Sequence, residues 1–338
     1  MEVAVLTYKC PACGSALNYE PQSGKFACAH CESLFDEAQL IHEEEAEQVG
    51  GAVVYSCPNC GGEVVTEETT AASFCYYCHS PVVLKGRVSG DWKPDGVLPF
   101  TVTREKAQEA FLKWAGKKRF TPAGFSAKKY IDKITGVYYP YWVTRVEFDA
   151  LFEGKGTRSS TVTTADRIIT TTKHYRVMRK ARMTFENLVR PALAKQDRLL
   201  ADGVQPYRLG DVQPFKESYL SGFQAERRDV EAAALAQDLV GEAKGYAGNM
   251  IRPQGVYQTL SGETRTSEAE VEHKYILLPA WVVTYKAPGG KIDYYIVNGQ
   301  TEETCGILPV SKQKLWGFGA AICGVITLLG CIGGYLLW

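Results

Sequence analysis

Residues 104–118 carry apolar side chains at the period of an α-helix. Four of them are spaced i, i+3, i+4 and i+7 and therefore share one helical face: Ala107, Ala110, Phe111 and Trp114. Thr103, just before this run, has a hydroxyl that can cap the first turn. The pattern predicts a helix over 104–118 that packs through this face.

Two longer segments and one shorter segment also have helical character. Apolar residues recur at helical spacing in 185–200 and 225–247, and Ser126 can cap a short helix that ends at Gly136. In 225–247 the predicted core stripe consists of Leu235, Leu239, Ala243 and Tyr246.

An acidic stretch near the N-terminus is predicted to be helical as well. Three apolar residues fall on one face of a helix over 34–49: Leu34, Ala38 and Ile41. The run Glu43-Glu44-Glu45 would then form a solvated face rather than a metal site. We therefore predict an acidic helical linker over 36–52.

Strand patterns dominate the rest of the region 87–310. Aromatic and β-branched runs predict strands over 137–148, 157–164, 168–183, 274–285 and 291–297. A turn at Ala165-Asp166 joins two of these strands, and Asn298-Gly299 is a two-residue hairpin signal. The region is expected to form an α+β domain rich in antiparallel strands.

The last segment, 315–338, is apolar on every face. It holds 24 residues without a charged side chain, roughly 36 Å of helix and enough to cross a ~30 Å hydrocarbon core. We predict one transmembrane helix within 311–338 that contacts the lipid bilayer through 315–338, with a buried soluble helix as the alternative. Small residues four apart would also permit helix pairing in a homo-oligomer: Ala320 with Gly324, and Gly330 with Gly334.

The charges beside this segment predict its orientation. Lys312 and Lys314 precede it and no charged side chain follows, so the positive-inside rule keeps the rest of the chain on the cytoplasmic side. The expected localisation is the cell membrane, with a single span and a cytoplasmic N-terminus.

Eight of the eleven cysteines lie in the first 78 residues as four CxxC pairs. Fourteen residues separate the two pairs of each set, and the second set repeats the first at an offset of 47. This spacing is typical of four-cysteine zinc ribbons, in which two tight turns aim four thiolates at one metal ion. The predicted Zn2+ ligands are Cys10, Cys13, Cys28 and Cys31 in ribbon 1 and Cys57, Cys60, Cys75 and Cys78 in ribbon 2.

Other interpretations of the cysteines have less support. A disulfide framework requires an oxidising compartment, and a thioredoxin-like site requires one CxxC beside a βαβ unit rather than four in register. His30 and His79 lie beside ligands, but both ligand sets are already complete. A zinc ion held by four thiolates has no open position for a substrate, so we expect two structural sites.

Charge separates the front of the chain from the remainder. The chain has 38 basic and 38 acidic residues, but residues 1–90 have a net charge of −8 and the remainder has +8. Acidic ribbons disfavour nucleic-acid binding, which depends on Lys and Arg. The basic stretch 173–182 would be a solvated sheet face or, alternatively, a contact for anionic lipid headgroups or an acidic partner.

The sequence has no recognisable catalytic motif. It lacks GxSxG, HExxH and a Gly-rich phosphate loop, and its five histidines are scattered. Cys305 has no evident base partner and is interpreted as a strand cysteine. The prediction is that the protein is not an enzyme.

Several motifs together resemble a bacterial family. Besides the ribbons and the last segment, they are Pro140-Tyr-Trp-Val143, Pro279-Ala-Trp-Val282, Asn298-Gly-Gln-Thr301 and Gly306-Ile-Leu-Pro309. The chain resembles the membrane-anchored TFIIB-type zinc-ribbon proteins, which are typically encoded beside phage-shock-A-like, TPM-domain and SPFH proteins. The resemblance implies a non-enzymatic role in membrane stress or organisation with such partners. Independently of it, the two P-x-W-V segments indicate two related β elements.

These inferences combine into one organisation: 1–35 zinc ribbon 1, 36–52 acidic helical linker, 53–86 zinc ribbon 2, 87–310 α+β cytoplasmic domain, and 311–338 transmembrane helix. The predicted function is a membrane-anchored zinc-binding adaptor whose ribbons bind protein partners. The alternative is a membrane-tethered zinc-ribbon protein that binds nucleic acid.

Overall fold

The computed structural model describes most of the chain, and its contacts divide the chain into two compact units. The described residues are 5–45, 53–57, 59–75, 77–117, 120, 133–164, 166–196, 198–286, 292–307 and 310–336. Unit 1 comprises residues 1–139, 195–227 and 277–338, and unit 2 comprises 140–194 and 228–276. The fold is α+β: among the described residues, thirteen strands join one mostly antiparallel sheet. The region 87–310, expected to form one domain, is divided between the two units.

The cysteine-rich region of unit 1 is built from short antiparallel strands. They are β1 (Val5–Lys9), β2 (Leu17–Glu20), β3 (Lys25–Cys28), β4 (Leu34–Phe35), β6 (Val53–Ser56), β7 (Glu63–Thr66), β8 (Thr70–Phe74) and β9 (Pro81–Leu84). Strands β2, β3 and β4 form a three-stranded sheet, and β6 and β7 form a pair. Strands β8 and β9 belong to the large sheet, in which β9 pairs with β1.

The predicted acidic helix over 36–52 is wrong. The chain forms one 3-10 turn, η1 (Glu37–Gln39), and then the strand β5 (Ile41–Glu45), while 46–52 lie outside the described residues. Strand β5 pairs antiparallel with β1, from Lys9 opposite Ile41 to Val5 opposite Glu45. Because β1 offers a backbone edge, strand pairing outweighs the helical propensity of the glutamates.

The rest of unit 1 contains short elements around two long strands that supply residues to both units, β11 (Thr135–Thr163) and β16 (Glu270–Lys286). The other helices and turns are η2 (Lys85–Arg87), η3 (Gly90–Trp92), α1 (Arg104–Gly116), α2 (Arg198–Gly203), η5 (Leu209–Asp211) and η6 (Glu217–Leu220). The strands are β10 (Gly96–Val97), β13 (Gln213–Pro214), β14 (Gln224–Glu226), β17 (Ile292–Asn298) and β18 (Thr304–Gly306).

Helix α1 confirms the periodicity analysis. The Thr103 side chain accepts a hydrogen bond from the backbone N–H of Lys106, as an N-cap should. Ala107 and Phe111 are buried, Ala110 and Trp114 are half-buried, and the rings of Phe111 and Trp114 contact Tyr295 of β17. The shorter helix predicted from Ser126 lies mostly outside the described residues.

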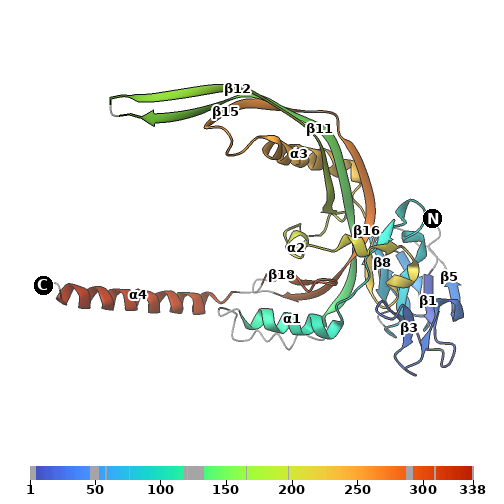
Figure 1. Cartoon of the computed structure of the whole chain (residues 1–338). Helices are drawn as coiled ribbons and strands as arrows, with labels where there is room; N and C mark the ends of the chain where they lie inside the picture. Colours follow the sequence, from blue (N-terminus) through green and yellow to red (C-terminus); the bar gives the residue numbers. More distant parts are fainter. Residues whose placement is uncertain are drawn as a thin grey trace. The chain divides into compact units, whose positions relative to one another are not determined.

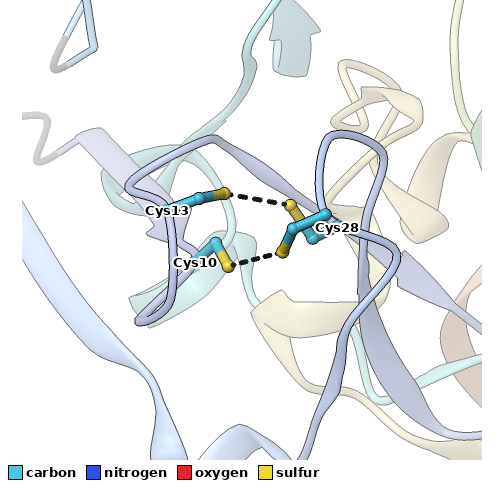
Figure 2. A group of neighbouring side chains, drawn as sticks. Cys10, Cys13 and Cys28 are labelled. Carbon is cyan, nitrogen blue, oxygen red and sulfur yellow. Dashed lines mark hydrogen bonds between the residues drawn. The ribbon is translucent and has the colours of Figure 1, made fainter.

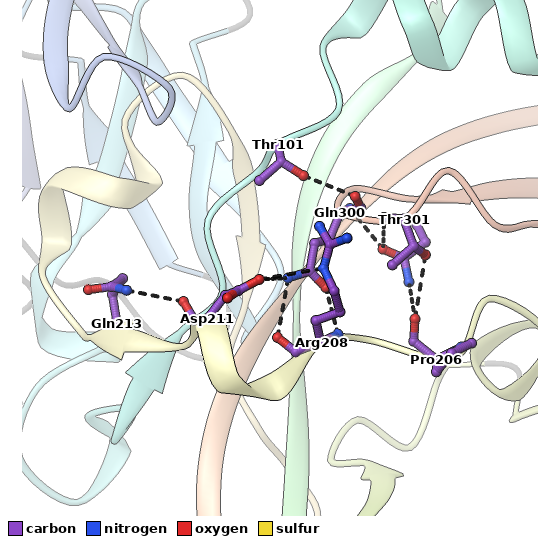
Figure 3. Close-up of polar contacts among 8 residues, drawn as sticks. Thr101, Pro206, Arg208, Asp211, Gln213, Gln300 and Thr301 are labelled. Atoms are coloured by element: carbon purple, nitrogen blue, oxygen red, sulfur yellow. Dashed lines mark hydrogen bonds and ion pairs between the residues drawn. The ribbon is translucent and has the colours of Figure 1, made fainter.

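The Asn298-Gly-Gln-Thr301 motif holds a loop of unit 1 (Figure 3). The Asn298 amide donates to the carbonyl oxygens of Val204 and Pro206, and its oxygen accepts from the N–H groups of Gln300 and Thr301. The Gln300 side chain in turn bonds both backbone groups of Arg208. The hairpin predicted here is confirmed, since β17 and β18 pair antiparallel, but its connection is longer than two residues: β17 ends at Asn298, β18 begins at Thr304, and the intervening segment belongs to this network.

Unit 2 is organised around a long antiparallel hairpin of β11 and β12 (Ile168–Pro191), flanked by β15 (Thr259–Thr266) and the helix α3 (Ala232–Ile251) (Figure 1). The core combines alternate residues of the hairpin, such as Phe148, Phe152 and Val177, with Ala243 and Ala247 of α3. The strands predicted over 137–148, 157–164 and 168–183 are confirmed. Ala165, at the predicted turn, lies outside the described residues.

Two helix predictions in this region need correction. Residues 185–191 continue β12, and among the described residues of the predicted 185–200 segment helical structure begins at Arg198, the start of α2. The segment 225–247 is helical from Ala232 onward. Leu239 and Ala243 are buried as predicted, but Leu235 is half-buried and Tyr246 is 60% exposed. The buried stripe continues through Ala247 instead, one turn after Ala243.

The last described element is the helix α4 (Lys312–Leu336), which confirms a helix within 311–338 but not the predicted membrane span. Large apolar side chains are exposed along it, among them Trp316, Val325, Ile326 and Leu329. Within the part of the chain that the structure describes, none of the helices combines the length and hydropathy needed to cross a membrane.

Candidate metal centres

Each CxxC pair begins the same backbone turn. The amide N–H of the first cysteine donates to the carbonyl oxygen five residues later, and its carbonyl oxygen accepts from the amide four residues later, at 2.8–3.0 Å. This arrangement recurs at Cys10, Cys28, Cys57 and Cys75. The turn directs the side chains of both cysteines of a pair to the same side, which is the geometry that metal ligands need.

A left-handed residue closes each turn. In the first turn of each ribbon this residue is a glycine, Gly14 (φ 74°) or Gly61 (φ 71°), and in the second turn it is Glu32 (φ 56°) or His79 (φ 58°). These turn residues were not predicted from the sequence, although the glycine after each first CxxC was a signal for the left-handed conformation. His79 therefore serves as a turn residue. Neither His79 nor His30 belongs to a ligand cluster among the described residues.

The structure brings all eight predicted ligands together in two clusters. Within each cluster the four sulfur atoms lie within 4.8 Å of one another. The Cys10–Cys31 and Cys13–Cys28 sulfur distances are 3.5 Å, and the corresponding distances in ribbon 2 are 3.7 Å. Figure 2 shows the sulfur atoms of Cys10, Cys13 and Cys28 directed into one shared space.

These distances fit a metal ion rather than disulfides. In a tetrahedron with metal–sulfur bonds of about 2.3 Å, neighbouring sulfur atoms are about 3.8 Å apart. A disulfide would bring two sulfur atoms to about 2.05 Å. A tetrahedral set of four thiolates suits zinc or iron. Each cluster can therefore hold one metal ion in a closed site.

The protein environment lowers the pKa of some cysteine thiols and raises the pKa of others. Burial raises the pKa of Cys57 to about 12. In ribbon 1 the Ser33 hydroxyl, 3.4 Å from Sγ of Cys31, lowers the pKa of Cys31 to about 6. At Cys78 burial acts in the opposite direction, but hydrogen bonds, led by that of the Asn59 side chain, outweigh it and lower the pKa to about 6. Each cluster thus contains a readily formed thiolate, and a metal ion must displace protons from the more resistant thiols.

A small apolar core surrounds each cluster. The ribbon 1 core contains Tyr8, Leu17, Phe26 and Leu40 with two of the cysteines, and Phe26 contacts the rings of Tyr8 and Tyr19. The core of ribbon 2 consists of Val5, Tyr55, Val64, Val82 and Leu84 with two other cysteines. Strand β1 contributes Val5 to one core and Tyr8 to the other, so it links the two metal centres.

A curated protein matches the chain over almost its whole length. The sequence is 32% identical over 335 residues to a Bacillus subtilis (strain 168) protein, and the match covers 95% of each chain. No protein-family model matches the sequence. No solved structure matches it either. On the strength of this full-length similarity, the chain belongs to the same family as the uncharacterized protein YdjG of Bacillus subtilis (strain 168).

Proposed function

We propose that the protein is a non-enzymatic, membrane-attached adaptor whose two zinc ribbons bind protein partners. The observation that carries this proposal is the closed geometry of both four-thiol clusters. Four thiolates fill the tetrahedral coordination of Zn2+, so the ion would stabilise the fold and have no position for a substrate. The function of the ribbons then depends on the surface that they present.

That surface includes exposed apolar side chains. Leu34 in ribbon 1 and Val65 in ribbon 2 are each 53% exposed, and Tyr77 is 69% exposed. Tyr77 lies between the ligands Cys75 and Cys78, so the metal site fixes its backbone. Exposed apolar side chains can mark interaction surfaces, and tyrosine is enriched among the residues that dominate binding energy. We infer that Val65 and Tyr77 contribute to the docking surface of ribbon 2.

Membrane attachment is proposed through the apolar C-terminal segment. The 24 uncharged residues of 315–338 and the exposed apolar side chains of α4 support it. In this arrangement the chain faces the cytoplasm, where thiols stay reduced and available for zinc. The resemblance to TFIIB-type zinc-ribbon proteins adds phage-shock-A-like, TPM-domain and SPFH proteins as proposed partners in membrane stress or organisation.

Affinity capture of the full-length protein from membranes tests the adaptor function. The wild type should retain partners, and both a zinc chelator and the double variant Val65→Ser/Tyr77→Ser should release them. The variant should still contain metal, because neither residue is a ligand. Tyr246→Ser, at an exposed tyrosine of α3, is the matched control and should retain the partners.

If capture is unchanged by the chelator and by the double variant, the ribbons are not the docking surface. Capture of DNA or RNA with a steep dependence on salt would favour the alternative, a nucleic-acid-binding ribbon protein. Flotation of the full-length protein with phosphatidylcholine vesicles tests the membrane attachment separately.

A further inference from the structure

The far end of the β11–β12 hairpin is a two-stranded ribbon. Strand β15 pairs with β11 only as far as Thr157. Beyond this residue the pairing partner of β11 among the described residues is β12, from Arg158 opposite Lys173 to Thr163 opposite Ile168. Hydroxyl pairs such as Ser159–Thr172, at 2.8 Å, join the two strands. A two-stranded ribbon has no core of its own, so its exposed side chains are available to a partner.

Along one face of this two-stranded end of the β11–β12 hairpin, the side chains change in character toward the tip. Because alternate residues share a face, the cross-strand pairs along it are Arg158 with Lys173, Ser160 with Thr171, and Val162 with Ile169. Val162 is 60% exposed and Ile169 is 51% exposed. Ile168, on the other face of the tip, is 71% exposed. The face therefore passes from cationic to small polar to apolar toward the tip.

The pair of cations is not neutralised by neighbouring carboxylates. Like charges directly opposite each other destabilise a sheet, and no ion pair of Arg158 or Lys173 with a carboxylate occurs among the described residues. Both side chains line a cavity of about 460 Å³, together with the contacting rings of Tyr175 and Tyr257. None of the residues lining this cavity is acidic.

The other cations of β12 differ from this pair. Lys180 contacts Asp149 at 3.7 Å, and Arg182 forms an ion pair with Glu147. Arg176 lies 3.9 Å from Glu153. The basic stretch 173–182 is therefore largely paired with carboxylates of β11. Arg179 donates to the Ile251 carbonyl instead. Arg158 and Lys173, without a carboxylate partner among the described residues, lie toward the tip on the face that carries Val162 and Ile169.

We propose that this hairpin tip docks on an anionic lipid bilayer. Val162, Ile168 and Ile169 enter the boundary between headgroups and acyl chains, and Arg158 and Lys173 bind headgroup phosphates. Val162 lies four residues beyond Arg158, about 13 Å along a strand. The long Arg and Lys side chains extend over part of that distance. Apolar and cationic groups in this order are typical of side chains at a bilayer surface.

The exposed apolar residues beside the turn, Val162, Ile168 and Ile169, favour lipid over nucleic acid as the partner, although the turn itself also carries the exposed charged residues Asp166 and Arg167. A phosphodiester backbone also attracts cations, but it offers no apolar region to Val162 or Ile169. The inference rests on the proposed membrane attachment, which would hold the chain at a bilayer. It adds a second contact, in unit 2, that depends on lipid charge.

Photo-cross-linking of the full-length protein in reconstituted vesicles tests the contact. Benzoylphenylalanine replaces Val162 in one protein and Tyr246, an exposed residue of α3, in the control. In vesicles of phosphatidylcholine with phosphatidylglycerol, position 162 should form lipid adducts well above position 246. Vesicles of phosphatidylcholine alone should give fewer adducts at position 162. Flotation of the same samples measures the attachment of the whole chain, so its failure is distinguished from failure of the hairpin contact.

Charge variants identify the cations responsible. Arg158→Gln/Lys173→Gln should lower the adduct yield at position 162 by roughly fivefold for each charge removed. Arg158→Lys/Lys173→Arg, which keeps both charges, should restore it. The matched control Lys180→Gln/Arg182→Gln removes two paired cations of the same strand and should leave the yield unchanged.

Three results would overturn the proposal. Lipid adducts at position 162 no more abundant than at position 246 would mean that the tip does not reach the bilayer. Equal losses in both double-glutamine variants would mean that overall charge, and not the tip pair, governs the contact. Adducts with added duplex DNA in place of lipid would identify the partner as nucleic acid.

Discussion

The two ribbons share one ligand pattern but differ in what supports them. In ribbon 1 the strands β2, β3 and β4, which lie between and after the two CxxC turns, form a sheet of their own. In ribbon 2 the corresponding strands are β7, β8 and β9: β7 pairs with β6, whereas β8 and β9 belong to the large sheet, where β8 pairs with β14 and β9 pairs with β1. The β2–β3–β4 sheet of ribbon 1 thus lies outside the large sheet, to which ribbon 1 is joined through β1, whereas β8 and β9 of ribbon 2 are held within that sheet.

This difference predicts how much each ribbon depends on its metal. A segment as short as ribbon 1 buries too little apolar surface to fold alone, so metal binding must supply much of its folding free energy. Its described links to the rest of unit 1 include the Ser221 hydroxyl, which donates to the Leu17 carbonyl at 2.9 Å, and the contact between the Tyr19 and Tyr219 rings. Strands β8 and β9 of ribbon 2 share backbone ladders with β14 and β1, and these ladders should persist without metal.

Removal of the metal should give the largest difference. Binding of a structural zinc ion contributes about 10–16 kcal/mol in small zinc modules. After chelation, hydrogen–deuterium exchange should become fast throughout β2 and β3, because the three-stranded sheet of ribbon 1 unfolds while β1 stays paired with β5 and β9. The amides of β8 and β9 should keep much of their protection, because they remain paired with β14 and β1. Equal loss of protection in both ribbons would contradict the comparison.

Truncation of one core residue in each ribbon should give the next largest difference between them. Phe26 and Leu84 are both fully buried. Phe26→Ala should therefore lower the free energy of unfolding of its module by about 3–5 kcal/mol, and Leu84→Ala by about 2–5 kcal/mol. Phe26→Ala should lower the metal affinity of ribbon 1 with little change in the main thermal transition. Leu84→Ala should lower the melting temperature itself, because Leu84 pairs with Val5 in the large sheet.

The reverse result, a lower melting temperature with Phe26→Ala alone, would show that ribbon 1 is coupled to the rest of unit 1 more tightly than ribbon 2. Metal content per chain and differential scanning calorimetry measure the two effects separately.

Buried polar contacts provide a finer comparison. Arg87 is 6% exposed, and its guanidinium donates hydrogen bonds to the carbonyl oxygens of Glu67 and Thr70. These two hydrogen bonds span the turn before β8. Arg87→Met should cost about 2–3 kcal/mol, since hydrogen bonds to charged groups are the stronger ones. Ser221→Ala should cost about 1 kcal/mol and should loosen ribbon 1 only. Urea unfolding and local exchange rates check both values, and loosening of ribbon 1 by Arg87→Met would contradict the assignment.

The metal centres could be predicted from the sequence because their information is local. Each CxxC turn is closed by hydrogen bonds within six residues, and the repeat at an offset of 47 indicates two equivalent sites. The cap of α1 and its buried face follow from equally local signals at Thr103 and Phe111. In these elements the residues that determine the structure are close neighbours in the sequence.

The wrong helix predictions concern segments whose structure depends on pairing with strands that are distant in the sequence. Segment 36–52 was predicted as a helix from its own composition, but the open edge of β1 makes Ile41–Glu45 a strand. In 185–200 a β-bulge produced a helical spacing. Thr144 pairs with Leu188 and Val146 with Phe185, so two residues of β12 lie opposite one of β11. The extra residue separates the apolar Phe185 and Leu188 by three positions, which imitates a helix.

The Trp residues of the two P-x-W-V segments show a likeness that sequence reasoning anticipated only in part. Trp142 Nε1 donates to the Val230 carbonyl at 2.8 Å, and Trp281 Nε1 donates to the Val102 carbonyl at 2.9 Å. Both indoles are buried and satisfied by backbone from a distant segment. The shared role is consistent with two related β elements.

The smallest expected effects concern the residue that closes the second turn of each ribbon. Glu32 and His79 occupy the left-handed conformation that glycine adopts at Gly14 and Gly61. Glu32→Gly should stabilise ribbon 1 by roughly 0.5–1 kcal/mol, because relief of backbone strain exceeds the added entropy of the unfolded chain. His79→Gly should stabilise ribbon 2 by less, since histidine tolerates this conformation better than glutamate. The measurement is the chelator concentration that removes half of the metal, with Glu32→Ala as the control that keeps a Cβ. A larger gain for His79→Gly than for Glu32→Gly would mean that the neighbouring strands, rather than the turn, set the stability of ribbon 2.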